Sequence, residues 1–138
     1  MPRFALSRWP WWRRWFGSRS ERAAEQFLRR QGYRILKRNY LCPGGELDLI
    51  ALDDQCLVFA EVRSTAGTDP LRPALSIDAE KQRRMTHAAT HFLHRHRLLD
   101  SICRFDVLLL CWPPEAREPA IVHHPNAFEA RGRFQIGR

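Results

Sequence analysis

The sequence contains no long hydrophobic run. No apolar stretch in its 138 residues approaches the roughly 20 residues needed to cross a bilayer. Residues 1–17 also lack the continuous apolar core of a secretory signal, because arginines interrupt every candidate. Hydrophobic residues make up 44% of the chain and charged residues 28%, which is typical of soluble globular proteins. We therefore expect a soluble, cytoplasmic protein whose length favours a single domain.

The four cysteines show no C-x-x-C spacing. They are Cys42, Cys56, Cys103 and Cys111. Three of them fall in strand-like apolar runs, where a free thiol behaves as a small hydrophobic group. We expect all four to be reduced and structural, which agrees with a reducing cytosol.

The histidines lack the glutamate of an H-E-x-x-H motif. His87, His91 and His94 follow one another at i, i+4 and i+7, a spacing compatible with a zinc site. They centre on the face opposite the apolar stripe of the helix expected there. We interpret them as solvated side chains and not as zinc ligands.

Acidic residues are absent from the first 17 positions, which hold four of the five tryptophans. The net charge of the chain is +8, and five arginines within residues 1–19 account for all but +3 of it. This charge favours a polyanionic partner, nucleic acid first and an anionic membrane surface second. Arg13 and Arg14 are candidate phosphate contacts beside stacking indole rings. A membrane anchor and a simple flexible arm remain as alternatives.

The remaining pattern predicts the element order α-β-β-β-α-β. Helices are expected at 18–31 and 78–97, strands at 33–40, 46–52, 57–63 and 103–112, and a short edge strand at 120–123. Gly32 is expected to end the first helix, and Asp78 to cap the second. Segment 64–77 is expected to be a loop beside a strand end. This order predicts an α/β fold with a mixed sheet flanked by helices.

Acidic residues recur on two neighbouring strands. Glu46 and Asp48 are two apart and are expected to share a face, as are Glu61 and Arg63. Pairing across the turn at 53–55 then makes Asp48 and Glu61 neighbours, and the opposite face can hold apolar residues that include Leu47 and Leu49. Adjacent carboxylates repel and have raised pKa values unless a cation lies between them. The pattern therefore suggests a Mg²⁺ or Mn²⁺ site, with Arg63 stabilising transition-state charge.

Several segments together resemble one protein family. They are Gly17-Ser18-Arg19-Ser20-Glu21, Gly32-Tyr33-Arg34-Ile35-Leu36, Gly44-Gly45-Glu46-Leu47-Asp48-Leu49-Ile50, Val58-Phe59-Ala60-Glu61-Val62-Arg63, Lys81-Gln82, Arg104-Phe105-Asp106-Val107 and Asn126-Ala127-Phe128. In this order and spacing the chain, from Gly17 to about Ala130, resembles the YraN family of bacterial proteins. Those proteins are similar in fold to PD-(D/E)XK endonucleases and Holliday-junction resolvases. The composition sets residues 1–17 apart as a flexible, basic, Trp-rich arm. The resemblance implies an endonuclease-like domain at 18–130, which leaves a C-terminal tail at 131–138.

The resemblance also implies roles for individual residues. Asp48 and Glu61 would hold the metal and Glu21 would add a carboxylate from the first helix. Arg63 would stand in the place of the motif's lysine, where an arginine stays charged and can only orient and stabilise. Apart from the resemblance, Lys81 could contact phosphate from the start of the second helix, where free N–H groups also favour anions.

The implied function is a metal-dependent nuclease acting on nucleic acid, with branched or single-stranded DNA as candidate substrates. A non-catalytic nucleic-acid-binding or assembly module is the alternative, and a homodimer remains open. Solvated strand faces and ion pairs could also explain the charged residues. Glu21 could serve the dipole of the first helical turn, Lys81 could be an ordinary solvated lysine, and Asp106 is expected to pair with Arg104.

Overall fold

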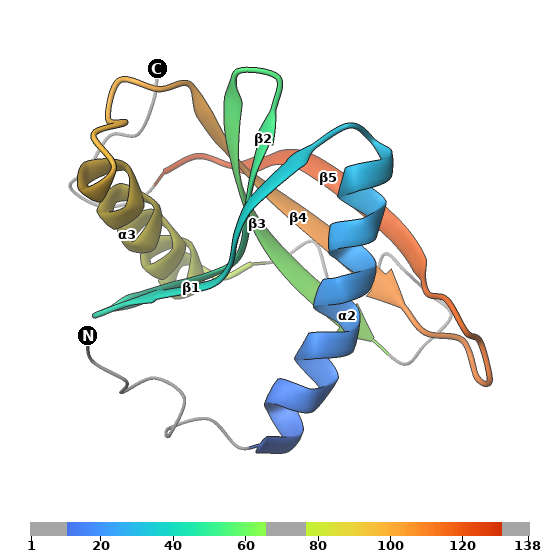
Figure 1. Cartoon of the computed structure of the whole chain (residues 1–138). Coiled ribbons are helices and arrows are strands. Elements are labelled where there is room, and N and C mark those ends of the chain that lie inside the picture. Colours follow the sequence, from blue (N-terminus) through green and yellow to red (C-terminus); the bar gives the residue numbers. More distant parts are fainter. Residues whose placement is uncertain (1–10, 66–76, 131–138) are drawn as a thin grey trace.

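The computed structural model describes residues 11–65 and 77–130. Two helices and five strands follow one another along this part of the chain (Figure 1). They are α2 (Trp11–Arg30), β1 (Arg34–Cys42), β2 (Gly45–Asp53), β3 (Cys56–Thr65), α3 (Ala79–Arg95), β4 (Cys103–Cys111) and β5 (Ala120–Phe128). The sequence also led to predictions for residues 1–10, for most of the loop at 64–77 and for the tail at 131–138. Those residues lie outside the described part of the chain.

The five strands form one mixed sheet in the order β1-β2-β3-β4-β5. Strands β1, β2 and β3 form an antiparallel meander, in which β2 and β3 pair across the turn at 53–55 as predicted. Strand β4 runs parallel to β3, and the crossover that a parallel pair requires contains α3. Strand β5 is antiparallel to β4 and forms the edge, but it continues to Phe128, beyond the short run predicted at 120–123. The α/β class and the mixed sheet are therefore confirmed.

The two helices cover opposite faces of the sheet, as Figure 1 shows. On one face, α2 packs Ala24 and Leu28 against a cluster that includes Ala60 and Leu108. On the other face, α3 packs its apolar stripe into a larger cluster that includes Phe59. Strand β4 contributes to both clusters and is buried over most of its length. The sheet is thus the middle layer of three, which makes its central strands apolar on both faces.

Local signals correctly predicted two of the helix ends. Gly32 has φ 95°, and the N–H groups of Gly32 and Tyr33 donate to carbonyls in the last turn of α2. This arrangement needs a left-handed residue, which glycine adopts without strain. Asp78 caps α3 by accepting a hydrogen bond from the backbone N–H of Lys81 at 2.8 Å.

Helix α2 begins at Trp11, earlier than the predicted start at residue 18. In the sequence, apolar residues show helical spacing only after Gly17, and glycine is unfavourable within a helix, so the start was predicted too late. Pro10 immediately precedes the first helical residue, and proline is well tolerated at a helix start. Residues 11–17 of the Trp-rich segment are thus part of the helix.

The β1–β2 hairpin changes its packing face near Asp48. Leu47 lies in the α3-side cluster, whereas Leu49 lies in the α2-side cluster. Between them Asp48 lies opposite Asn39, which has a left-handed φ of 50°. The prediction that Leu47 and Leu49 share one face is therefore wrong, because simple alternation holds only for a regular strand.

All four cysteines are free, as predicted. Cys42 and Cys111 are buried, and burial raises the pKa of the Cys103 thiol to about 12. We therefore interpret these thiols as small apolar groups of the fold. Among the helices within the described ranges, none has the length and apolarity needed to span a bilayer.

Candidate functional site

Acidic side chains from three elements gather beside the second half of β3. Leu49 of β2 pairs with Ala60 of β3, so the preceding residue of β2, Asp48, lies next to Glu61. The backbone N–H of Val62 donates a 2.8 Å hydrogen bond to Oδ2 of Asp48 and holds this carboxylate against β3. The neighbouring arrangement of Asp48 and Glu61 expected from the sequence is therefore present.

Glu61 is the most enclosed acid of this group. Its side chain is only 9% exposed, and its Oε1 is buried without a hydrogen-bond partner among the described residues. Nζ of Lys81 lies 3.5 Å from Oε1, and Nε of Arg63 lies 3.8 Å from Oε2. Both cations are at ion-pair distance but leave Oε1 without a hydrogen bond. A buried acceptor left in this state costs about 1–3 kcal/mol.

Burial and neighbouring carboxylates raise the pKa values of Asp48 and Glu21. Burial and then the negative charge of Glu61 raise the pKa of Asp48 well above its usual range, which the Val62 N–H and Lys81 only partly oppose. Burial and then Asp48 raise the pKa of Glu21 to about 7, against a hydrogen bond with Asn39. The negative charge of Glu46 also contributes to this rise in the pKa of Glu21. An additional cation would relieve this repulsion.

Glu21 reaches the group from α2. Because this helix begins at Trp11, Glu21 is more than two turns from its start and no acid lies in the first turn. The interpretation that Glu21 serves the helix dipole is therefore wrong. Its electrostatic coupling to Asp48 and Glu46 instead places its carboxylate beside those of β2.

Lys81 is held inside the acidic group by the packing of α3 on β2. Its side chain is only 14% exposed and lies 3.6 Å from Oε1 of Glu46 as well as 3.5 Å from Glu61. Gly45 permits this approach, because a Cβ atom there would lie 2.6 Å from the carbonyl oxygen of Arg84. The alternative of an ordinary solvated lysine is therefore wrong.

Two carboxylates are the ligand set that this site offers to a metal ion. Within the described ranges, no three His, Cys, Asp or Glu side chains are arranged to hold one. Mg²⁺ is commonly bound through only one or two carboxylates, with water and substrate phosphate completing its coordination. Glu61, whose Oε1 accepts no hydrogen bond from the described residues, and the neighbouring Asp48 fit that requirement.

The histidine prediction needs one correction. His87 and His94 are exposed, but His91 is partly buried and its Nδ1 forms a hydrogen bond with the hydroxyl of Tyr40. The Tyr40 and His91 rings also lie close together, with centroids 5.8 Å apart. His91 therefore joins α3 to β1, a contact that the helical spacing of the histidines does not reveal.

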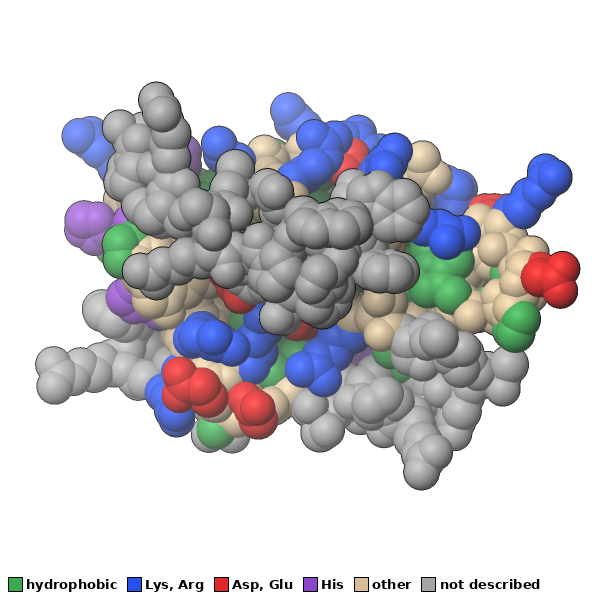
Figure 2. All heavy atoms as spheres, turned by 90° about the horizontal axis from the view of Figure 1, so that it is seen from below, with side chains coloured by type: hydrophobic (Ala, Val, Ile, Leu, Met, Phe, Trp, Pro, Cys, Tyr) green, Lys and Arg blue, Asp and Glu red, His purple; other side chains and the backbone are tan. Residues whose placement is uncertain are grey.

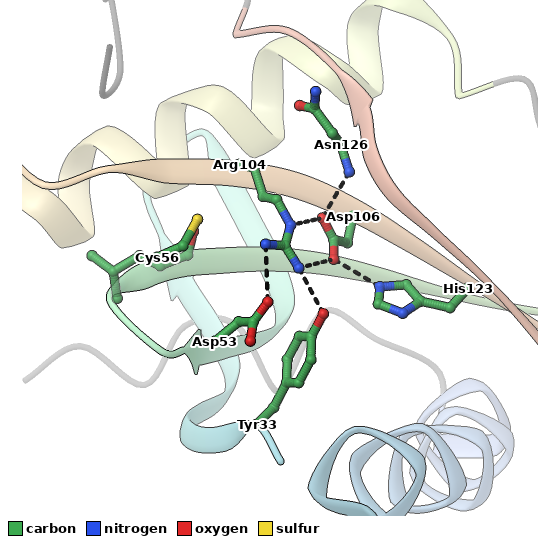
Figure 3. A network of polar contacts seen from close by, with 8 residues as sticks. Tyr33, Asp53, Cys56, Arg104, Asp106, His123 and Asn126 are labelled. Carbon is green, nitrogen blue, oxygen red and sulfur yellow. Dashed lines mark hydrogen bonds and ion pairs between the residues drawn. The ribbon is translucent and has the colours of Figure 1, made fainter. Parts of the chain in front are cut away.

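A separate polar network surrounds Asp106 at the start of β4 (Figure 3). Arg104 donates to both oxygens of Asp106, as predicted, and His123 and the backbone N–H of Asn126 also bond to this carboxylate. Burial alone would raise the pKa of Asp106, but hydrogen bonds from His123 and Arg104 hold it below its usual value. The network joins β4 to β5.

Arg104 extends this network to the other end of β2. It donates to the hydroxyl of Tyr33 at 2.6 Å and to Oδ2 of Asp53 at 3.2 Å. Both carboxylate oxygens of Asp106 thus have hydrogen-bond partners. Oε1 of Glu61, in contrast, accepts no hydrogen bond from the described residues. We therefore interpret the Asp106 network as structural.

The sequence reading missed a third ionic group. Glu25 is buried on α2 and accepts hydrogen bonds from Arg29 and Arg38. The bond from Arg38 is the main cause that lowers its pKa to about 2. The Glu25–Arg29 spacing of i, i+4 is visible in the sequence, but the partner on β1 is not. The side chains of Arg13 and Arg14 lie outside the described part of the molecule.

Comparison with known proteins agrees with the resemblance seen in the sequence. A protein 42% identical over 119 residues, from Rhodopirellula baltica, covers 84% of this chain and 71% of its own length. Similar proteins from Geobacter metallireducens and Pelobacter propionicus are 40% and 44% identical over 113 and 115 residues. They cover 82% of this chain, and 91% and 81% of their own lengths. All three carry the name UPF0102 protein. The model of the uncharacterised protein family UPF0102 matches residues 20–110, and this chain belongs to that family.

Proposed function

We propose that this protein is a metal-dependent phosphodiesterase that acts on nucleic acid, with a fold of the PD-(D/E)XK endonuclease type. The observation that carries the proposal is the pairing of Asp48 with Glu61, whose Oε1 is buried without a hydrogen-bond partner. Burial of one carboxylate beside another is energetically unfavourable, and acids that only faced solvent would not need it.

Asp48 and Glu61 are the residues that would hold the metal, with Glu21 as a third carboxylate nearby. A bound Mg²⁺ or Mn²⁺ ion would supply Lewis-acid activation of the phosphate and of water. The chain itself provides an enclosed position for a charged group, because Glu61 is buried and α3 packs closely on β2 through Gly45. Enclosure strengthens electrostatic interactions with a bound phosphodiester.

Two cations complete the proposed site. Lys81 occupies the position beside Glu61 where a phosphate oxygen would need a positive neighbour. Arg63 contacts the same carboxylate from β3 and stays protonated throughout, so its role is to orient and stabilise. The arginine in the motif's lysine position is therefore accompanied by a lysine from α3.

The charge of the surface supports nucleic acid as the substrate class. The chain carries a net charge of +8. Lys and Arg side chains lie in several groups around the face of the molecule seen in Figure 2. A polyanion would be attracted to such a surface, and its phosphates would be the natural ligands of the arginines.

One observation favours a non-catalytic nucleic-acid-binding module as a second candidate. Lys81 forms ion pairs with both Glu46 and Glu61, and Arg63 adds a third contact. These pairs partly neutralise the acids without any metal. In such a module, nucleic-acid affinity would not depend on divalent ions and would fall steeply with salt.

The two candidates are separated by one experiment. The purified chain is incubated with Mg²⁺ or Mn²⁺ and with duplex, branched and single-stranded DNA and RNA, and metal uptake is measured by titration calorimetry. We expect cleavage and metal uptake by the native chain, and the loss of both in Asp48→Asn. Asp100→Asn, at an exposed position, is the control. Absence of cleavage, or equal cleavage by Asp48→Asn, would reject the enzyme.

A further inference from the structure

An arginine-lined groove lies on the flank of α2, between this helix and the segment that joins β4 to β5. Its volume is about 200 Å³. Four of its lining residues are arginines, Arg19, Arg22, Arg30 and Arg117, and one is acidic, Glu118. Trp112 forms part of its wall. The local charge is therefore strongly positive.

Most of these arginines have no acidic partner. Within residues 19–64 and 77–130, no ion pair or side-chain hydrogen bond involves Arg22, Arg30 or Arg117. Other arginines of the same helix and sheet are paired, such as Arg29 and Arg38 with Glu25. Like charges gathered in one groove repel, and Glu118 is the one acid among the lining residues, so a bound anion would relieve this repulsion.

Arg19 is held in place by the wall of the groove. Its guanidinium lies 3.9 Å from the centroid of the Trp112 ring, a cation–π contact. The indole Nε1 donates a 3.1 Å hydrogen bond to the hydroxyl of Ser20, which fixes the ring against α2. Arg19 is thus positioned before any ligand arrives, which lowers the entropic cost of binding.

The arginines are arranged in a row and not around a point. Arg19, Arg22 and Arg30 lie along α2, and at the rise of an α-helix Arg19 and Arg30 are separated by about 16 Å along the axis. This length suits several consecutive phosphates of a strand better than one isolated anion. The guanidinium groups can also bind phosphate oxygens through two hydrogen bonds each.

We propose that this groove binds the phosphodiester backbone of a nucleic-acid strand, independently of its base sequence. The inference rests on nucleic acid being the substrate class proposed above, but it does not require catalysis. Arg22 and Arg30 lie on the flank of α2 that borders the groove, whereas Glu21 couples to the acids of β2. The helix would therefore anchor the strand on one flank while contributing an acid to the metal site on another.

The test is a binding titration of the full chain carrying Asp48→Asn, in EDTA, with a labelled single-stranded DNA oligonucleotide. The triple variant Arg22→Gln/Arg30→Gln/Arg117→Gln is compared with Arg34→Gln/Arg95→Gln/Arg97→Gln. Both variants remove the same charge from exposed positions. We expect the groove variant to bind about tenfold more weakly, and its salt slope to fall by about 2, since each lost phosphate contact contributes about 0.7 for a single strand.

Three outcomes would overturn the proposal. The first is unchanged oligonucleotide binding by the groove variant. The second is an equal loss of oligonucleotide binding in both variants. The third is a loss of binding to phosphatidylserine vesicles that exceeds the loss of oligonucleotide binding, which would assign the groove to a membrane surface. Thermal unfolding of both variants checks that the fold is retained. The titration excludes metal and uses Asp48→Asn, so it does not depend on catalysis. If the native chain cleaves no nucleic acid but the groove variant still binds the oligonucleotide more weakly, only the proposed nuclease activity is rejected and the groove proposal stands.

Discussion

Nζ of Lys81 lies 3.5 Å from Oε1 of Glu61, the buried carboxylate oxygen that has no hydrogen-bond partner among the described residues. The lysine comes from the first turn of α3 and the acid from β3, so the contact joins two elements across the sheet surface. Lys81 thus supplies the positive charge nearest to the least satisfied atom of the site.

Removal of this charge should destabilise the metal-free protein. In Lys81→Gln the acids of β2 and β3 lose a compensating cation, and we expect the free energy of unfolding to fall by about 1–3 kcal/mol. Urea denaturation measures the change, with the exposed Lys37→Gln as control. Equal stabilities of the two variants would show that Lys81 does not compensate the acids.

Neutralisation of Glu21 should have the opposite effect at high pH. Its folded-state pKa of about 7 lies above the ordinary value of 4.5, so the stability of the native chain falls as pH rises from 4.5 through 7. Glu21→Gln removes this loss and should be the more stable protein above pH 7, with little difference below 4.5. Thermal unfolding across this range checks the prediction, and Glu129→Gln at an exposed position should show no such trend.

Glu25 should give the reverse pH dependence. Its folded-state pKa of about 2 lies below the ordinary value of 4.5, so its contribution is present above 4.5 and is lost as pH falls through 2. Glu25→Gln should lower the free energy of unfolding by about 1.5–3 kcal/mol at neutral pH, because it weakens bonds from two arginines. The deficit should shrink during acid titration, and a deficit independent of pH would contradict the ionic explanation.

Gly45→Ala should separate β2 from α3. The new Cβ would lie 2.6 Å from the carbonyl oxygen of Arg84 and 2.9 Å from the backbone nitrogen of Ala88, neither of which can rotate away. We expect a destabilisation of about 1–3 kcal/mol, typical of overpacking, together with weaker metal uptake because β2, the strand that carries Asp48, is displaced.

Gly32→Ala is the matched comparison for Gly45→Ala. Its Cβ would meet nothing within 4 Å, so the left-handed φ of 95° is the only source of strain. It should cost about 1 kcal/mol and leave metal uptake unchanged. Equal metal uptake by both glycine variants would show that the packing at Gly45 does not position the site. Urea denaturation and calorimetry measure the two effects.

Local patterns in the sequence determined most of the element order and one central feature of the site. Helical periodicity, Gly32 and Asp78 predicted helix ends, and the turn at 53–55 predicted the pairing of β2 with β3. That pairing makes Asp48 and Glu61 neighbours, because an antiparallel hairpin sets its register over a few residues. Glu21 was inferred only from the resemblance to a family, since nothing in its own segment connects it with β2.

Only the tertiary structure decided which distant groups meet these acids. Lys81 reaches Glu46 and Glu61 because Gly45 lets α3 approach β2, and Arg104 reaches Tyr33 because β4 lies beside β3. The change of packing face in the β1–β2 hairpin near Asp48 also depends on how the layers pack, as does the groove beside α2. Periodicity reports which face of an element is apolar, but contacts between elements depend on their packing angle and offset, which no short segment contains.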